Sequence, residues 1–273
     1  MQQSNTYIIV YSAVLTIILG LLLSGSAQVL GPWQQEAIAL DKKKQILGAV
    51  ISAEEIAAMT PEQVNKFYET RISSTVVDLS GAEITKEGIT AEKVEIAKDF
   101  KKKPEERSYP VFIFHAEGNP EAVESYIFPM YGAGLWDAIW GYIALESDMR
   151  TIKGAVFDHK GETAGLGAEI TQQWFQDRFV GEKITDTNGT LVGIAVSKTN
   201  NDPLGNDKED HEVDAISGAT ITGDGVTDMI SERLAHYTPY LKRAISKPVE
   251  EIMEETSTEE IPSEEAQTIA YQN

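Results

Sequence analysis

The chain has 273 residues, which is enough for a sizeable core in one or two domains. Its 43 acidic and 23 basic residues give a formal net charge of -20, which argues against nucleic-acid binding because phosphates require a basic surface. It contains no cysteine, so disulfides, cysteine-bound zinc, iron–sulfur clusters and a cysteine nucleophile are excluded, and any redox chemistry requires a bound organic cofactor.

An uncharged apolar segment at residues 7–30 predicts a single transmembrane anchor, because about 20 such residues cross a bilayer as a helix. A cleaved signal peptide is the alternative, since small residues at 24–27 follow an apolar run. A retained anchor is favoured because no Lys or Arg precedes the run, which continues to Leu30. The charges leave the orientation open: the lysines at 42–44 favour a cytoplasmic soluble part, yet large domains cross membranes despite such charges.

Residues 31–72 predict a helical stalk after the anchor. A helix is expected over 34–50, and two further helix starts follow it. Ser52 and Thr60 each stand three residues before a Glu or Gln, which is the capping-box pattern, and the second has Pro at the first helical position.

From residue 73 the pattern changes to strands, and residues 73–248 predict a mixed α+β domain rather than a doubly wound sheet. A short helix is expected at 169–179, and apolar spacings of three and four predict a last helix beyond residues 214–220. The Glu-rich segment 249–273 predicts a disordered, solvated tail, and residues 86–107 are ambiguous. Strands are predicted at 75–79, 111–114, 126–128, 141–145, 152–156 and 191–196.

The segment 214–220, Asp-Ala-Ile-Ser-Gly-Ala-Thr, lies where the last helix begins. Gly218 allows a tight turn and a close approach to a ligand. Thr220 offers a hydroxyl near a helix N-terminus, where free N–H groups and the helix dipole favour a phosphate. Ser and Thr at such a position also serve simply as caps, so this segment alone leaves capping and anion binding open.

Four segments together resemble one family: the anchor with residues 34–47, and the segments 131–142, 161–169 and 214–220. They are similar to the C-type subunit of the sodium-translocating NADH:quinone reductase, a respiratory complex of the bacterial inner membrane. The resemblance extends to about residue 243 and is carried by the order and spacing of the segments. One departure is Ala164, where the family usually has a Pro that would fix the backbone.

The resemblance implies an electron-transfer subunit that carries FMN on Thr220 through a phosphoester. It implies a flavin transferase that attaches FMN from FAD, and other membrane subunits as partners. It also implies a single-pass protein with residues 1–6 in the cytoplasm and the soluble domain in the periplasm. The expected enzyme is therefore a Na⁺-transporting NADH:quinone reductase, of which this chain is one subunit.

A tethered phosphate places the flavin ring within one molecule's length of Thr220. Backbone N–H groups of Gly165, Leu166 and Gly167 are expected near the flavin edge, although such a turn is commonly only a turn. Trp136 is open between lining the flavin and packing in the core. Asp214 and Ser217 are expected to serve the transferase and local hydrogen bonding. The predicted cofactor-binding residues are Leu135, Trp136, Glu162, Thr163, Gly165, Leu166, Gly167, Asp214, Ser217, Gly218, Ala219 and Thr220.

No catalytic residue and no metal ligand is predicted, because the four histidines lack metal-ligand spacing and Ser217 lacks a Gly-x-Ser-x-Gly elbow. Two other functions stay open. One is the G-type subunit of the related ferredoxin-dependent ion pump, which shares the anchor and the flavin-attachment motif. The other is a flavin-free, membrane-anchored periplasmic binding or assembly protein, in which Ser217 and Thr220 are plain caps.

Overall fold

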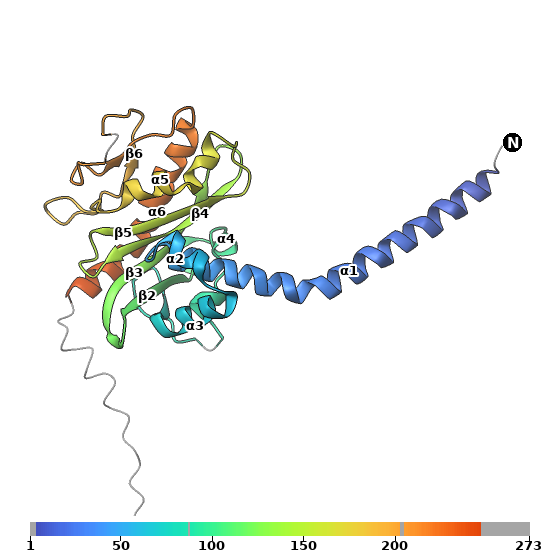
Figure 1. The fold of residues 1–273 in the computed structure, drawn as a ribbon, viewed down its shortest axis with the longest axis horizontal. Helices are drawn as coiled ribbons and strands as arrows, with labels where there is room; N and C mark the ends of the chain where they lie inside the picture. The colour runs from blue at the N-terminus through green and yellow to red at the C-terminus, as the bar shows by residue number, and fades with distance from the viewer. Residues whose placement is uncertain (1–3, 87, 203–204, 247–273) are drawn as a thin grey trace, which may run out of the picture.

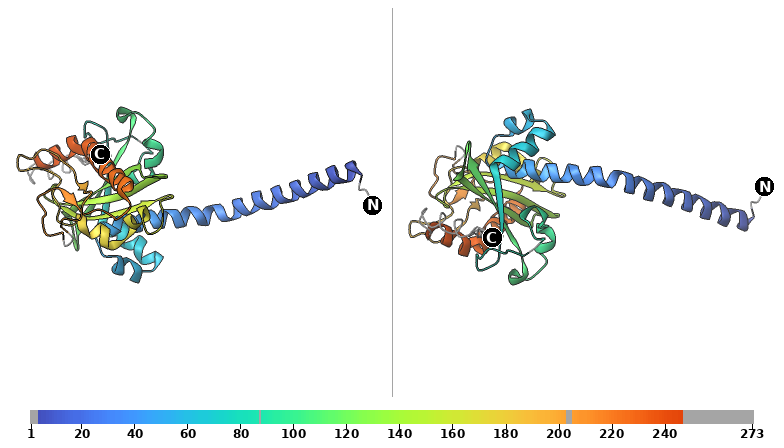
Figure 2. Two further views of the ribbon diagram at one scale, coloured as in Figure 1. Left: turned by 90° about the horizontal axis from the view of Figure 1, so that it is seen from above. Right: turned by 90° about the horizontal axis from the view of Figure 1, so that it is seen from below.

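The computed structural model describes residues 4–86, 88–202 and 205–246, so the predicted tail at 249–273 lies outside the described residues. A single long helix, α1 (Asn5–Gly48), projects from a domain of strands and helices, as Figures 1 and 2 show. The fold is therefore α+β, as expected. Anchor and stalk form one continuous helix, with Pro32 inside it, rather than a spanning helix followed by a second helix.

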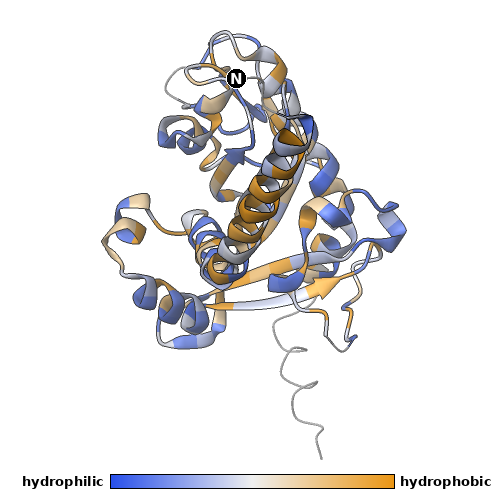
Figure 3. Ribbon diagram, turned by 90° about the vertical axis from the view of Figure 1, so that its right-hand side faces the viewer, coloured by the Kyte–Doolittle hydropathy of each residue, from blue (hydrophilic) through white to orange (hydrophobic). Residues whose placement is uncertain are grey.

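Helix α1 is long and apolar enough to cross a membrane, and its apolar turns are exposed (Figure 3). The aromatic side chains near its two ends fit a membrane span. Tyr7 and Tyr11 stack on each other near the start, and Trp33 is 68% exposed. At 1.5 Å per residue, Tyr7 and Trp33 are about 39 Å apart along the axis, which is close to the thickness of a bilayer with its interfaces. Aromatic residues are enriched at both interfaces, so this spacing supports a membrane anchor.

Two short helices follow α1: α2 (Ala53–Ala58) and α3 (Pro61–Arg71). Thr60 and Gln63 exchange both hydrogen bonds of a capping box at the start of α3. Ser52 accepts only the bond from the Glu55 N–H, so the box predicted at Ser52 is half formed. With the end of α1, these helices cover one face of the sheet and bury Ile46, Leu47, Val64 and Tyr68.

The sheet is an antiparallel meander in the order β1-β2-β3-β4-β5. Its opposite face is covered by the last helix, α6 (Thr220–Ser246), which packs along β3 and buries Val226, Ile230 and Leu234 (Figure 1). Each strand thus presents side chains to two cores. The strands are β1 (Ile72–Val77), β2 (Tyr109–Ala116), β3 (Asn119–Ala133), β4 (Ala138–Glu146) and β5 (Ile152–His159).

The segment between β5 and α6 differs from its prediction. The helix expected at 169–179 is split into three pieces, which fold Ile170, Phe175 and Phe179 into the core beside Phe157. The pieces are η3 (Gly167–Thr171), α5 (Gln173–Gln176) and η4 (Asp177–Phe179).

The strand predicted at 191–196 is also too long. Only β6 (Ala195–Val196) is a strand, because Gly193 takes a φ of 73° that interrupts the extended backbone. β6 pairs in parallel with β7 (Glu212–Val213), which the sequence pattern did not predict. The ambiguous stretch before β2 contains η1 (Ala91–Lys93), α4 (Ile96–Asp99) and η2 (Pro104–Glu106).

Candidate cofactor site

Three segments that are far apart in the sequence meet in one cleft of about 240 Å³. They are the turn between β3 and β4, the loop after β5, and the start of α6. Eight of the twelve predicted residues line the cleft, and Trp136, Gly165, Asp214 and Ser217 lie outside its lining. The cleft is lined by Leu135, Glu162, Thr163, Leu166, Gly167, Gly218, Ala219, Thr220, Ile221 and Thr222.

Exposed apolar side chains stand around this cleft. Leu135 is 45% exposed, Leu166 40% and Ile221 58%. Trp136 is 69% exposed and so does not belong to the core, while its indole N–H donates to the Thr163 hydroxyl at 3.1 Å. Water-exposed apolar groups gathered at one hollow are typical of a site that takes an apolar ligand.

Glu162 joins the three segments through its carboxylate. Oε1 accepts from the Trp136 N–H at 2.9 Å, and Oε2 accepts from the Thr222 hydroxyl at 2.6 Å. Burial opposes its ionisation, but the bonds from Thr222 and from the backbone N–H groups of residues 135–137 outweigh this and lower the pKa of the carboxyl. The side chain is only 7% exposed. Glu162 therefore lines the cleft as a buried residue that holds its three segments together, and both of its carboxylate oxygens already accept hydrogen bonds from the protein.

The carboxylate of Glu162 lies very close to two glycines of the site, Gly134 and Gly167. A Cβ on Gly134 would lie 2.5 Å from Oε1, and a Cβ on Gly167 would lie 2.5 Å from both Oε2 and the Thr222 hydroxyl. Both distances are far below van der Waals contact, so a side chain at either position would force the Glu162 carboxylate out of its place. Sequence reasoning missed Gly134 and Thr222; the signal for Gly134 was its place in the Gly-rich turn beside Leu135 and Trp136.

Two of the three N–H groups at residues 165–167 have acceptors within the protein. The Gly165 N–H donates to the Glu169 carboxylate at 3.2 Å, and the Leu166 N–H donates to the Thr163 carbonyl at 3.1 Å. The N–H groups of Gly165 and Leu166 therefore already have protein acceptors, which does not favour the expected approach of these two groups to a flavin edge. Within the described residues, only the Gly167 N–H of the three lacks an acceptor.

Among the described residues, no side chain accepts a hydrogen bond from the first N–H groups of helix α6. Thr220 is its first residue, and the Ala219 carbonyl accepts the first helical bond, from Gly223 at 2.9 Å. Ser217 is exposed, precedes the helix start by three residues and makes no side-chain hydrogen bond in the described part of the chain, so its expected capping role is wrong. The N–H groups of residues 220–222 have no acceptor among the described residues, and the Thr220 side chain is exposed beside them.

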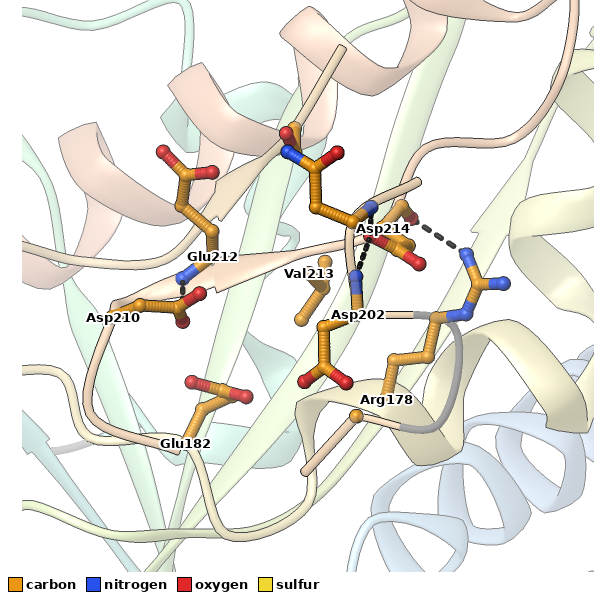
Figure 4. Close-up of a pocket in the computed structure, with 10 residues that line it drawn as sticks. Arg178, Glu182, Asp202, Asp210, Glu212, Val213 and Asp214 are labelled. Atoms are coloured by element: carbon orange, nitrogen blue, oxygen red, sulfur yellow. Dashed lines mark hydrogen bonds between the residues drawn. The ribbon is translucent and has the colours of Figure 1, made fainter. Parts of the chain in front are cut away.

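Asp214 lies in a separate cavity of about 70 Å³, shown in Figure 4. It is 5% exposed, and its Oδ1 accepts from the N–H groups of Asn201 at 3.0 Å and Asp202 at 3.2 Å. Its backbone carbonyl accepts from Arg178 at 2.7 Å (Figure 4). The expected local hydrogen bonding is present. Recognition of the folded chain by a transferase through this side chain conflicts with its burial.

The described residues contain no group of three or more His, Asp or Glu side chains that could hold a metal ion. Tyr142 lies in the core and is 6% exposed. Trp140 is partly buried and donates to Gln45 of α1 at 3.3 Å.

Comparison with known proteins places this cleft in a described family. A family model for the FMN-binding domain matches residues 134–235, a range that contains all twelve predicted residues. The chain is 31% identical to the C-type subunit of the Na(+)-translocating NADH-quinone reductase of Neisseria meningitidis, over 88% of this chain and 93% of the relative. The chain belongs to the family of C-type subunits of this reductase.

Two further members support this placement. The C-type subunit of the reductase of Pseudomonas aeruginosa is 29% identical over 84% of this chain and 91% of the relative. The crystal structure of the corresponding subunit from Parabacteroides distasonis has a TM-score of 0.64 and 33% identity, and the match covers 78% of this chain and 96% of that chain. The C-type family thus shares this fold, and the FMN-binding match supports FMN as the cofactor.

Proposed function

We propose that this chain is the C-type, electron-transfer subunit of a sodium-pumping NADH:quinone reductase and carries FMN covalently on Thr220. The observation that carries the proposal is the coincidence of an exposed threonine hydroxyl with free backbone N–H groups in a cleft of the FMN-binding domain. When bound, the flavin supplies the electron chemistry, and the chain supplies position and environment.

The start of α6 suits the phosphate of FMN. A helix of 27 residues directs its dipole at this end, and the N–H groups of residues 220–222 are free of acceptors in the described part of the chain. Both features favour an anion. The first turn of α6 carries two threonine hydroxyls. Thr220 is exposed, whereas Thr222 is 1% exposed and its hydroxyl donates to Glu162. Thr220 is therefore the attachment residue that this geometry favours.

The exposed apolar groups suit the flavin ring. Leu135, Leu166 and Ile221 would contact its faces and edge, and Trp136 would stand at the rim. Gly218 has a φ of 76°, and a Cβ at this position would lie 2.9 Å from the Leu166 side chain, so glycine allows the backbone to approach Leu166 closely. The cleft is open, so part of the ring stays accessible for electron exchange with a neighbouring subunit.

Attachment requires an external enzyme. We expect a flavin transferase to join the Thr220 oxygen to the FMN phosphorus of FAD, breaking the bond to the AMP phosphate and releasing AMP and the hydroxyl proton. Glu162 is the nearest carboxylate on the cleft lining, and both of its oxygens already accept hydrogen bonds. The base that removes the proton is therefore expected to come from the transferase.

We place the soluble domain in the periplasm of a bacterial inner-membrane complex, beside its other membrane subunits. Two of the lysines at 42–44, whose charges favour a cytoplasmic soluble domain, make hydrogen bonds within the folded domain. Lys42 donates to the Glu92 carbonyl at 2.8 Å, and Lys43 donates to Asn65 at 2.8 Å. These lysines are thus explained by the fold, which weakens them as a signal of orientation. Protease treatment of intact spheroplasts would digest the domain if this placement is right and spare it otherwise.

Covalent flavin is tested by expressing the full chain with a flavin transferase, denaturing it and recording in-gel flavin fluorescence. The wild-type chain and Ser217→Ala should fluoresce, and Thr220→Val should not. A dark wild-type band, or a fluorescent Thr220→Val band, would overturn the proposal. Membership of the C-type family favours the sodium pump over the G-type alternative, and the FMN-binding match argues against a flavin-free protein.

A further inference from the structure

The anchor helix ends directly on the strand that leads into the cofactor loop. A Cβ on Gly154 of β5 would lie 2.5 Å from the carbonyl oxygen of Ala49, immediately after α1. A Cβ on Gly48 would lie 3.1 Å from a methyl group of Val156 in the same strand. Because α1 is one helix, with Pro32 inside it, from the apolar segment to this contact, no linker separates the apolar segment from the junction with β5.

Gln45 bonds the last turns of α1 to two neighbouring strands of the sheet. Its Nε2 donates to Asp158 of β5 at 3.1 Å and to Asp41 of α1 at 3.1 Å, and its Oε1 accepts from the Trp140 indole of β4 at 3.3 Å. An indole can only donate and a carboxylate can only accept, so these partners fix which way the amide points. Gln45 therefore uses both ends of its side chain for the junction between the anchor and the domain.

From Asp158 the bonds continue to the cofactor cleft. The other carboxylate oxygen of Asp158 accepts from the His159 N–H at 2.7 Å, and His159 Nδ1 accepts from the Glu162 N–H at 3.1 Å. Accepting through Nδ1 requires the proton of a neutral His159 to sit on Nε2. The Glu162 carboxylate then holds Trp136 and Thr222. A single chain of hydrogen bonds thus leads from the anchor helix to the first turn of α6.

We infer that Gln45 is a positioning residue that ties the anchor helix to the cofactor cleft, so that a displacement of α1 alters the setting of the loop after β5. The part of this inference that concerns the flavin rests on the proposed function. The part that concerns the loop does not. Neither the anchor nor Gln45 touches the cleft, so the effect passes through Asp158, His159 and Glu162.

The test uses the full chain in detergent micelles, without flavin, and measures amide hydrogen exchange by mass spectrometry. The variants are Gln45→Met, which keeps the length but removes all three bonds, and Gln45→Glu, which sets a carboxylate against Asp41 and Asp158. Gln35→Met, at an exposed position of the same helix, is the matched control. Exchange in residues 159–167 should rise roughly fivefold in Gln45→Met, the factor for one net hydrogen bond, and more in Gln45→Glu.

Exchange in residues 126–130 of β3 serves as the internal reference and should not change. If exchange at 159–167 equals that of Gln35→Met, or rises equally in the reference, the inference is wrong. A second measurement uses the flavin-loaded chain: the midpoint potential of the flavin should shift in Gln45→Met and stay at the wild-type value in Gln35→Met. Unaltered potentials with altered exchange would also overturn the link to the cofactor. Failure to load flavin at all would count against the proposed function, while the exchange measurement would still decide the inference.

Discussion

Replacing Gly167 by Ala should disturb the cleft more than any other single methyl group in the loop. The added Cβ would lie 2.5 Å from Glu162 Oε2 and 2.5 Å from the Thr222 hydroxyl, so it must break the 2.6 Å bond between them. A hydrogen bond to a charged group contributes about 1.5–3 kcal/mol, and overpacking costs about 1–3 kcal/mol. Because some strain is relieved when the bond breaks, we expect a loss of about 3 kcal/mol in the free energy of unfolding.

The loop offers a matched control in Gly161→Ala. A Cβ there meets only Asp137 at 3.8 Å, an ordinary contact, and its φ is not positive. Such a change should stay within about 0.5 kcal/mol. For a chain of this size, 3 kcal/mol corresponds to a drop in Tm of roughly 6–12 °C, measured by circular dichroism of the full chain in detergent. Flavin loading by the transferase should fall in Gly167→Ala and not in Gly161→Ala.

The reasoning requires the damage to pass through Glu162, which a double-mutant cycle can examine. In a Glu162→Ala background one of the two close contacts is gone and the Thr222 hydroxyl, no longer bonded to Glu162, is free to rotate away, so Gly167→Ala should cost less than it does in the wild-type chain. Equal Tm values for Gly167→Ala and Gly161→Ala would refute the reasoning. Additive losses in the Glu162→Ala, Gly167→Ala double variant would refute it as well.

Two other predictions concern buried polar groups. Thr222→Val should lower the free energy of unfolding by about 1.5–3 kcal/mol and reduce flavin loading, because it leaves Glu162 Oε2 without its hydroxyl donor. Thr222→Ser retains the hydroxyl and should keep wild-type stability and flavin loading. A Thr222→Val variant with wild-type stability and loading would contradict this prediction. Burial raises the pKa of Glu182 from 4.5 to about 7 despite its bond to Lys208, so the folded state holds this proton more tightly than the unfolded state. Stability should therefore fall as pH rises from about 4.5 to 7, by on the order of 2 kcal/mol, and Glu182→Gln should flatten the Tm profile over that window; an unchanged slope would contradict the assignment.

Local patterns in the sequence were sufficient for the features that depend on near neighbours. The apolar run at 7–30, the capping box at Thr60 and the α+β class all follow from short-range periodicity and composition. The strand expected at 191–196 failed because Gly193 turns the backbone, and nothing in the apolar pattern signals a positive φ. The pairing of β6 with β7 joins two-residue strands across a long loop, which leaves almost no pattern to detect.

In the candidate site, too, the sequence predicted local features and missed contacts between residues that are far apart in the chain. Segment spacing brought together residues of the turn, the loop and the helix start that line one cleft. The sequence pointed to Glu162 as a candidate but did not reveal that its carboxylate joins these segments, because its partners Trp136 and Thr222 lie 26 and 60 residues away. The surroundings of Ser217 and Asp214 also depend on parts of the chain that the segment 214–220 does not contain. The helix begins three residues after Ser217, and the buried Asp214 accepts hydrogen bonds from the distant residues Asn201 and Arg178.

The central claim is that the phosphate of FMN is attached to Thr220, and peptide mass spectrometry tests it most directly. The full chain, produced with a flavin transferase, is digested, and the peptide that spans residues 214–233 is fragmented. The account predicts a mass increase of one FMN less one water, located on Thr220. The same modification on Ser217 or Thr222, or an unmodified peptide from a fully loaded sample, would contradict the account.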